Sequence, residues 1–278
     1  MPLPDLSNSM YVARLRYIQS IHEPAERRNP DVLVRHFLST ITQLRGALLG
    51  QDKLAALRAD PFYYFLVART RYYDQVLNDA IHGGARHVVS IGSGSDTRPH
   101  RFAELLSMHD VTVLECDQAE AIRAKLRITK RLKGVERVEY LPVDLNDDNW
   151  PDLMGRLRSC RGTKVLVTME GVSPYINDGD FRRFLKLLAT ELAPGSQIAY
   201  DYKLHGVKED FGQSARTTVP FRLPSDRDQV AAFHKALRLE LTHFELSSEL
   251  CARLLPNLPG TAPLFTEDAL ARLQVGSA

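Results

Sequence analysis

The feature that most limits the fold of this chain is the stretch Arg86–Thr97, in which a β-branched run breaks into the turn Gly92-Ser93-Gly94. A short apolar run of this kind is typical of a buried parallel strand. Glycine has no Cβ, so the backbone can turn sharply after the strand and lie close to a ligand. The stretch therefore predicts a parallel sheet that holds a nucleotide-like ligand at the end of its first strand.

Strand and helix signals alternate along the chain from this point. Apolar, β-rich runs predict strands at 86–91, 111–115, 137–141, 164–169, 196–202 and 238–245. Amphipathic runs between them predict helices at 99–107, 118–132, 150–160, 178–193 and 226–236. This alternation is typical of an α/β fold with a doubly wound, mostly parallel sheet. The signals weaken after residue 246.

Helical signals precede the first strand and predict an N-terminal helical cap over residues 1–84. Asp31 is expected to cap a helix over residues 32–57. A second helix is expected to begin at Pro61, because proline suits a first helical turn, and to end at a glycine pair. We expect this cap to form one compact unit with a core over residues 85–278.

A polar stretch at 203–227 interrupts the core after the fifth strand. A long irregular insertion in a compact domain is often a substrate lid, and the alternative is a plain surface loop. The sequence favours neither interpretation over the other.

The composition argues against several classes of partner. A formal net charge of +2 over 278 residues is too small to predict nucleic-acid binding, and the basic run from Arg123 to Lys133 is interpreted as the solvated face of a helix. No apolar run approaches the ~18 residues of a membrane span. The three cysteines form no CxxC pair and, with no signal peptide, favour a reduced, cytoplasmic setting. The histidines show no metal-ligand spacing, so no metal site is expected, and a homodimer remains open.

Acidic residues follow three further predicted strands. Asp117 stands at the end of the second strand, where the ribose-binding acid of a nucleotide-binding sheet is expected. A carboxylate suits that role because it can accept hydrogen bonds from both hydroxyls of a ribose. Asp144, followed by Leu145, comes just after the third strand and can accept from an adenine amine, and Glu170 ends the fourth strand. These acids and the glycine turn are expected to form a ring around one ligand.

The same residues discriminate between adenine cofactors. A dinucleotide-binding turn would carry a third glycine where this chain has Thr97, and the turn also lacks the GxxxxGK[ST] pattern of a phosphate cradle. S-adenosyl-L-methionine has an adenine and a free ribose but no pyrophosphate, and its cationic sulfonium suits a pocket with several acids. It therefore fits the ring better than NAD does. An NAD-dependent oxidoreductase is the weaker alternative, as is a non-catalytic protein that keeps the fold as a scaffold.

Five motifs of the chain resemble those of a known family. They are Ala68–Asp74, Ile91–Arg98, Leu114–Asp117, Val143–Leu145 and Glu170–Tyr175. In this order they are similar to the successive motifs of the leucine carboxyl methyltransferase family. Within that family the chain resembles the bacterial branch of natural-product O-methyltransferases of the tetracenomycin type. The resemblance implies a Rossmann-like class I methyltransferase sheet of seven strands, whose last strand is in doubt because the chain departs from the family pattern near its C-terminus.

The resemblance also implies a set of cofactor-binding residues. The residues that match the family's S-adenosyl-L-methionine contacts, or stand beside them, are Arg16, Arg69, Gly92, Ser93, Gly94, Asp117, Gln118, Asp144, Leu145, Glu170 and Gly171. Arg69 matches the arginine that holds the methionine carboxylate, and the resemblance also allows it to reach a substrate carboxylate. Glu170 matches the acid that faces the methionine amino group. Asp117 is implied to bind the ribose, and Asp144 with Leu145 the adenine.

The predicted reaction is the transfer of a methyl group from S-adenosyl-L-methionine to an oxygen atom. The expected acceptor is a hydroxyl or carboxyl group of a small secondary metabolite, with an antibiotic-type polyketide as the first expectation. A peptide or protein C-terminus is the alternative. The aromatic-rich helix that begins at Pro61 and the insertion at 203–227 are expected to form the acceptor pocket in either case.

Three residues are candidates for acting on the acceptor. The resemblance implies that Tyr175 helps to orient it. Asp201 and His205, at and just beyond the end of the fifth strand, are candidate bases, and the alternative is a structural aspartate and a solvent-facing histidine. A carboxylate acceptor is already ionised at pH 7 and needs no base, whereas a phenol with a pKa near 10 gains from one.

Overall fold

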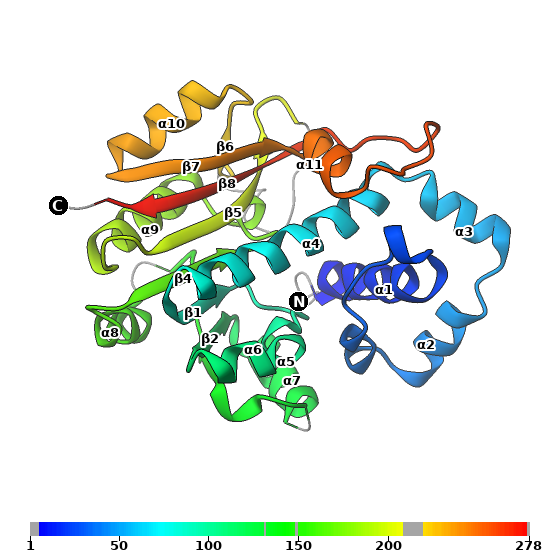
Figure 1. Cartoon of the computed structure of the whole chain (residues 1–278), viewed down its shortest axis with the longest axis horizontal. Helices are drawn as coiled ribbons and strands as arrows, with labels where there is room; N and C mark the ends of the chain where they lie inside the picture. The colour runs from blue at the N-terminus through cyan, green and yellow to red at the C-terminus, as the bar shows by residue number, and fades with distance from the viewer. Residues whose placement is uncertain (1–5, 131, 148–149, 208–218, 277–278) are drawn as a thin grey trace.

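A mostly parallel sheet runs through the centre of the computed structural model, which describes residues 6–130, 132–147, 150–207 and 219–276 (Figure 1). Within these residues the strand order is β3-β2-β1-β4-β5-β8-β7, and the short β6 pairs with β5. The strands are β1 Ala85–Ile91, β2 Thr112–Asp117, β3 Val138–Pro142, β4 Lys164–Met169, β5 Gln197–Leu204, β6 Arg222–Leu223, β7 Leu239–Leu246 and β8 Asp268–Val275. The first five strands in this sheet order, β3, β2, β1, β4 and β5, are parallel to one another. Strand β8 is antiparallel to both β5 and β7. The predicted α/β fold with a mostly parallel sheet is confirmed.

Strand β1 lies at the point where the order of the sheet reverses. It pairs with β2 on one edge and with β4 on the other. Its neighbouring residues Val88 and Val89 point to opposite faces and pack into separate apolar clusters. In an open α/β sheet such a reversal leaves a crevice beyond the carboxyl ends of the strands, where ligands bind.

Helices cover both faces of the sheet. They are α1 Leu6–His22, α2 Thr40–Ala47, α3 Gln51–Arg58, α4 Pro61–His82, α5 Arg98–Arg101, α6 Ala103–Met108, α7 Ala119–Thr129, α8 Pro151–Ser159, α9 Asp178–Glu191, α10 Arg227–Ala236 and α11 Ser247–Leu254. Helix α4 runs across one face of the sheet (Figure 1) and shares an apolar cluster with Leu166. On the other face, α8, α9 and α10 share an apolar cluster with Val167 and Ile198. None of the helices in the described ranges is long and apolar enough to cross a membrane. The division into residues 1–84 and 85–278 stays a prediction.

The N-terminal region differs from the prediction. The single helix expected over residues 32–57 is three shorter pieces, a 3₁₀ turn at Leu33–Phe37 followed by α2 and α3. Ser39 accepts a hydrogen bond as the N-cap of α2, and Gly50 occupies the N-cap of α3, so the helix is interrupted at both residues. Helix α1 has no counterpart in the prediction, because its sequence is polar and mixed.

The last strand, which the sequence left in doubt, is present as β8. Its sequence is rich in Ala, Leu and Arg, which favour helices, so local propensity hides it. Pairing with β5 on one edge and β7 on the other buries most of its residues and overrides that propensity.

The insertion predicted at 203–227 is shorter at both ends than expected. Strand β5 continues to Leu204, and α10 begins at Arg227, with β6 pairing beside β5. Residues 208–218, in the middle of the insertion, lie outside the described residues. The lid interpretation therefore stays a prediction.

Candidate active site

A cavity of about 1080 Å³ opens at the carboxyl ends of β1, β2, β4 and β5. Helix α1, the first turn of α4 and the loop before β8 contribute the rest of its lining. All eleven residues predicted to bind the cofactor line this cavity. Side chains from separate stretches of the sequence therefore meet where the strand order reverses.

The glycine turn has a backbone that only glycine fits without strain. Gly92 has a φ of +65°, and a Cβ built there would lie 2.4 Å from Cγ2 of Val172. The amide of Gly94 donates to Oδ2 of Asp117 over 2.7 Å, and the amide of Gln118 donates to Oδ1 over 2.7 Å. Burial raises the pKa of the Asp117 carboxyl, although both amides oppose the rise. The glycine turn and the Asp117 carboxylate are thus hydrogen-bonded to each other in one part of the cavity wall.

A second polar group lies where β3 ends. The side chain of Gln118 donates to Oδ2 of Asp144 over 3.1 Å and so joins the residues after β2 and β3. The amide of Asn146 donates to Oδ1 of Asp144, and the Asp144 carbonyl accepts from the indole of Trp150. Leu145 is buried beside them and lines the cavity. This end offers a carboxylate edge and an apolar surface, which suits a flat heterocycle that carries an amine.

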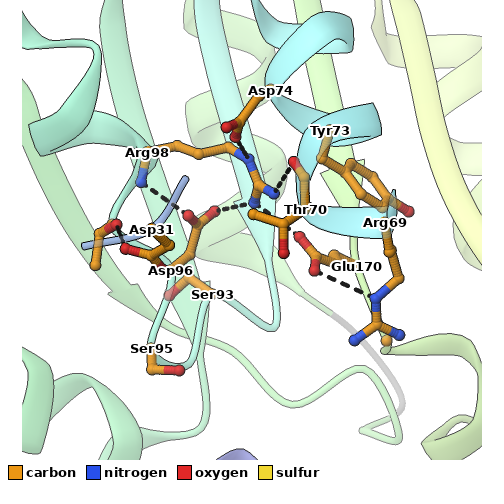
Figure 2. A network of polar contacts seen from close by, with 12 residues as sticks. Asp31, Arg69, Thr70, Tyr73, Asp74, Ser93, Ser95, Asp96, Arg98 and Glu170 are labelled. Atoms are coloured by element: carbon orange, nitrogen blue, oxygen red, sulfur yellow. Dashed lines mark hydrogen bonds and ion pairs between the residues drawn. The ribbon is translucent and has the colours of Figure 1, made fainter. Parts of the chain in front are cut away.

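Glu170 lies between two arginines just after β4 (Figure 2). Its Oε1 is 3.3 Å from Nε of Arg69 on α4, and its Oε2 is 2.7 Å from Nη1 of Arg98. Burial alone would raise the pKa of Glu170, but the guanidiniums of Arg98 and Arg69 hold it below its usual range. The carboxylate is therefore ionised and can hold a cationic group at this end of the cavity.

The residues that follow the glycine turn anchor it to α4. Arg98 donates to Oδ1 of Asp74 on α4 over 2.9 Å and to Oδ2 of Asp96 over 3.0 Å, as Figure 2 shows. Thr97, at the position of the third glycine of a dinucleotide motif, is fully buried and donates to Oδ1 of Asp31. Asp96, Thr97 and Arg98 therefore hold the turn in place through contacts with the rest of the protein.

Arg16 holds α1 against the same turn. Its Nη1 lies 3.0 Å from Oδ2 of Asp31, and its Nη2 donates to Oγ of Ser95 over 2.5 Å. Asp31 also accepts from the amide of Val34 in the 3₁₀ turn, whose N-cap is Val32, so Asp31 does not have its predicted role as the N-cap of a long helix. Because Arg16 is buried and lines the cavity, α1 covers one side of the site.

One cation of the basic run does not lie on a solvated face. Lys125 on α7 is buried, and its Nζ lies 2.6 Å from Oε1 of Glu115 and 3.1 Å from the carbonyl oxygen of Ser93. Burial raises the pKa of Glu115 to about 7, although Lys125 opposes the rise. The prediction that the run from Arg123 to Lys133 is solvated is therefore wrong at this position. The buried pair instead supports the glycine turn.

Asp201, one of the two predicted bases, lines the cavity at the end of β5 and is almost fully buried. Its carboxylate accepts from Arg69 over 3.2 Å, from the hydroxyl of Tyr73 over 2.9 Å and from the amide of Gly171 over 2.7 Å. Three donors occupy most of its lone pairs, so the contacts favour the structural interpretation of Asp201.

His205, the other predicted base, lies away from the site. Its side chain is exposed, and its Nε2 is 3.2 Å from the carbonyl oxygen of Arg222. It is absent from the cavity lining formed by the described residues. Strand β5 ends at Leu204, so His205 lies in the turn that follows, with Gly206 next to it at a φ of +86°. The expectation that His205 sits at the pocket mouth is therefore wrong.

The aromatic cluster of α4 mostly fills the core. Tyr63, Phe65 and Tyr73 are fully buried in the apolar cluster between α4 and the sheet. Of the aromatic residues of α4, Phe62 is the one that lines the cavity among the residues that the structure describes. Tyr175, predicted to orient the acceptor, lines the cavity from the turn after β4.

The cavity has a further end that the sequence analysis missed. It lies beyond Arg69, where β5 meets β8, and is lined by Phe62, Lys203, Phe265, Glu267 and Asp268. Lys203 and Asp268 stand opposite one another in the β5–β8 pairing. No local signal could have joined them, because the strand that carries Asp268 was not predicted.

The polar atoms of the cavity wall fit S-adenosyl-L-methionine. Oγ of Ser93 and Nε of Arg16 are buried and have no hydrogen-bond partner among the described residues, while Nε of Arg69 has only its ion pair with Glu170. Such atoms are expected where a polar ligand completes the bonding. Together with the carboxylates of Glu170 and Asp117, they match a ligand with an amino group, a carboxylate and a ribose. In the same described part of the chain, no group of three or more His, Cys, Asp or Glu could hold a metal ion.

Curated relatives of the chain carry methyltransferase names. A Mycolicibacterium smegmatis protein named "Putative S-adenosyl-L-methionine-dependent methyltransferase" is 31% identical over 155 residues, which are 55% of this chain and 48% of the relative. A relative from Frankia alni with the same description is 28% identical over 204 residues, which are 72% of this chain and 69% of the relative. The chain thus spans about half the length of the mycobacterial relative.

A solved structure and a family model extend this comparison. The structure of a "putative methyltransferase from Thermobifida fusca YX" has a TM-score of 0.55 at 13% sequence identity and covers 96% of this chain and 94% of that one. That likeness shows the fold, a class I methyltransferase sheet. The model of the leucine carboxyl methyltransferase family matches residues 8–189, well over half of the chain. The chain therefore belongs to the leucine carboxyl methyltransferase family.

Proposed function

We propose that this protein transfers the methyl group of S-adenosyl-L-methionine to a hydroxyl or carboxyl oxygen of a small secondary metabolite, with an aromatic polyketide as the first candidate. The observation that carries the proposal is one continuous cavity that joins the cofactor residues to a partly aromatic end. The rings of Phe62 and Phe265 meet edge to face there, with centroids 5.6 Å apart. Walls of this kind suit a flat ring system.

The contacts give less support to the other acceptor and the other cofactor. A peptide or protein C-terminus would need a cation. Among the described residues at this end, Arg69 is proposed to hold the carboxylate of the cofactor, and Lys203 already contacts two carboxylates of the protein. An NAD-dependent reaction would need room for a pyrophosphate at the glycine turn. The buried Thr97 side chain occupies that part of the turn and bonds to the protein.

The proposed reaction asks the protein mainly to bind and orient. When bound, S-adenosyl-L-methionine supplies a methyl group that a nucleophilic oxygen can attack. Asp117 is proposed to accept from the ribose hydroxyls, and Asp144 with Leu145 to hold the adenine. Glu170 is proposed to bind the amino group and Arg69 the carboxylate. These contacts would fix the methyl group so that the acceptor oxygen approaches in line at about 3 Å.

Calorimetric titration with S-adenosyl-L-methionine, S-adenosyl-L-homocysteine and NAD tests the cofactor site. We expect both sulfur ligands to bind and NAD not to bind. Asp117→Ala should weaken S-adenosyl-L-methionine binding tenfold or more, because a hydrogen bond to a charged group contributes about 1.5–3 kcal/mol. Asp152→Ala removes an exposed acid on α8 and is the matched control. An unchanged Kd in Asp117→Ala would remove Asp117 from the site, and no binding of either sulfur ligand would refute the proposal.

Methyl transfer is tested with a cofactor that is labelled in its methyl group. The acceptor panel contains aromatic phenols, aromatic acids and peptides with free C-termini. Label in a small aromatic product supports the proposal. Label that enters only the peptides selects the alternative acceptor instead.

A further inference from the structure

Among the residues that the structure describes, the cations at the acceptor end of the cavity already contact carboxylates of the protein. Arg69 lies 3.3 Å from the carboxylate of Glu170 and 3.2 Å from that of Asp201. Nζ of Lys203 likewise lies 3.0 Å from the carboxylate of Glu267 and 3.0 Å from that of Asp268. Because Arg69 is proposed to hold the carboxylate of the cofactor, an acceptor carboxylate would have to compete with Glu267 and Asp268 for Lys203. A buried acid such as Asp268 without its cation is strongly unfavourable. A neutral acceptor avoids this conflict.

Asp268 is the acid of this end whose bonding capacity is least used. Its side chain is 5% exposed and lines the cavity. Its Oδ1 lies 3.0 Å from Nζ of Lys203, and Lys203 is its one side-chain partner among the residues that the structure describes. A buried carboxylate with a single partner at a cavity wall keeps lone pairs that can bind a hydroxyl donor.

The neighbouring acids are less suited to take a proton from an acceptor. Asp201 already accepts from three donors. Glu170 is held between two guanidiniums. Glu267 shares Lys203 with Asp268, but its side chain is 36% exposed, so water solvates its charge.

We propose, resting on the methyl transfer proposed above, that the acceptor is a neutral aromatic hydroxyl and that Asp268 is the catalytic base that takes its proton. The aromatic walls and the base lie together, because Phe265 and Asp268 belong to one short segment at the start of β8. Nζ of Lys203 lies 4.7 Å from the centroid of the Phe265 ring. An ammonium beside the acceptor ring would stabilise negative charge that develops on the hydroxyl oxygen.

The proposed step balances in atoms and charge. The hydroxyl oxygen forms a bond to the methyl carbon while the carbon–sulfur bond breaks, and the electron pair of that bond stays on sulfur. The hydroxyl proton passes to Asp268, which later releases it to solvent. A neutral phenol and a sulfonium thus give a methyl ether, S-adenosyl-L-homocysteine and one proton.

The charges around Asp268 support this role. Burial raises the pKa of Asp268 to about 6, and Asp201 adds to the rise, whereas Lys203 and Arg69 oppose it. Among the described residues, Glu267 also contacts Lys203. The carboxyl group is therefore ionised at neutral pH and takes up a proton more readily than an exposed aspartate does.

2-Naphthol and 2-naphthoate test the class of acceptor, because they share a two-ring frame and differ in carrying a neutral hydroxyl or a carboxylate. Calorimetry on the protein loaded with S-adenosyl-L-homocysteine should show that 2-naphthol binds at least tenfold more tightly. Tighter or equal binding of 2-naphthoate, or a methyl ester as the main labelled product, would overturn the proposal. Failure of both probes to bind would overturn it as well. Loss of S-adenosyl-L-homocysteine binding would instead refute the proposed function.

Asp268→Asn and Glu267→Gln each remove one carboxylate beside Lys203, but only Asp268→Asn removes the proposed base. Comparing the two variants therefore distinguishes a role as base from a role as partner of the Lys203 charge. We expect Asp268→Asn to lower kcat/KM for 2-naphthol about a hundredfold or more and to keep S-adenosyl-L-homocysteine binding within about threefold. The wild-type rate should rise with pH through about 6, and Asp268→Asn should lack that rise. Glu267→Gln should lose about fivefold at most, because its partly exposed ion pair contributes little.

Equal losses in the two variants, or an Asp268→Asn variant that keeps the rise with pH, would show that Asp268 is not the base. Asp268→Glu keeps a carboxyl group and should recover part of the rate. Circular dichroism checks that each variant is folded. If Asp268→Asn does not fold, the proposal requires Asp268→Glu to shift the midpoint of the pH profile, and an unmoved midpoint would refute the role of base.

Discussion

Replacing Gly92 by alanine tests whether the glycine turn depends on its shape. The backbone at Gly92 has a φ of +65°, and an L residue in that region is less stable than glycine by about 1–2 kcal/mol. The new Cβ would also lie 2.4 Å from Cγ2 of Val172, far inside the usual carbon contact of about 3.5–4.0 Å. Overpacking of this kind costs about 1–3 kcal/mol. We therefore expect Gly92→Ala to lower the free energy of unfolding by about 2–5 kcal/mol.

Urea unfolding measures the loss of stability, thermal unfolding measures the Tm, and titration calorimetry measures the affinity for S-adenosyl-L-methionine. The Tm should fall by at least about 4 °C, because 1 kcal/mol corresponds to roughly 2–4 °C in larger domains. The affinity for S-adenosyl-L-methionine should fall about tenfold or more, since a movement of the turn also moves the Gly94 amide away from Asp117, and tenfold corresponds to about 1.4 kcal/mol.

A double variant separates the clash from the backbone strain. Val172→Ala removes Cγ2 and leaves its Cβ at 3.5 Å from the added methyl group, an ordinary contact. In a double-mutant cycle, Gly92→Ala and Val172→Ala should therefore couple favourably by about 1–3 kcal/mol. Additivity within about 0.5 kcal/mol, or a Gly92→Ala variant as stable as wild type, would refute the steric reasoning.

Two further predictions concern buried charges. Lys125→Met should lower the free energy of unfolding, measured in urea, by about 3–5 kcal/mol, because it leaves Glu115 buried without its cation. Adding Glu115→Gln should recover most of this loss. A double variant no more stable than the single one would contradict the explanation. Burial lowers the pKa of His234 to about 4, so between that pH and about 6.5 the unfolded chain binds more protons than the folded one. The free energy of unfolding should therefore fall as the pH drops through this range, and His234→Gln should flatten that slope; an unchanged slope would assign it to other groups.

The cofactor end of the site could be predicted because each of its parts ends a strand. The Gly92 turn, Asp117, Asp144 and Glu170 each follow an apolar run, and parallel strands bring their carboxyl ends to one edge of the sheet. Position in the sequence is then enough to place these side chains around one cavity, which all of them line. His205 is the exception, because it stands one residue beyond the end of β5, in an exposed turn outside the lining formed by the described residues.

The acceptor end could not be predicted, because it depends on pairing between distant strands. Asp268 meets Lys203 only when β8 enters the sheet, and the sequence of β8 resembles that of a helix. Lys125 was misassigned for a similar reason, since its position on α7 looks solvated until Glu115 on β2 is placed beside it. Burial of an ion pair is a tertiary property that helical periodicity does not report.

The place of β8 between β5 and β7 has a consequence for synthesis of the protein. Until β8 has left the ribosome, the edge of β5 lacks the long partner that covers it, and β7 lacks the strand with which it pairs. The growing chain therefore exposes an apolar strand edge late in translation, which is the kind of edge that associates with other chains. The same late event sets Asp268 beside Lys203. A nascent chain that stalls before β8 would already carry the residues proposed to bind the cofactor, but it would lack the proposed base.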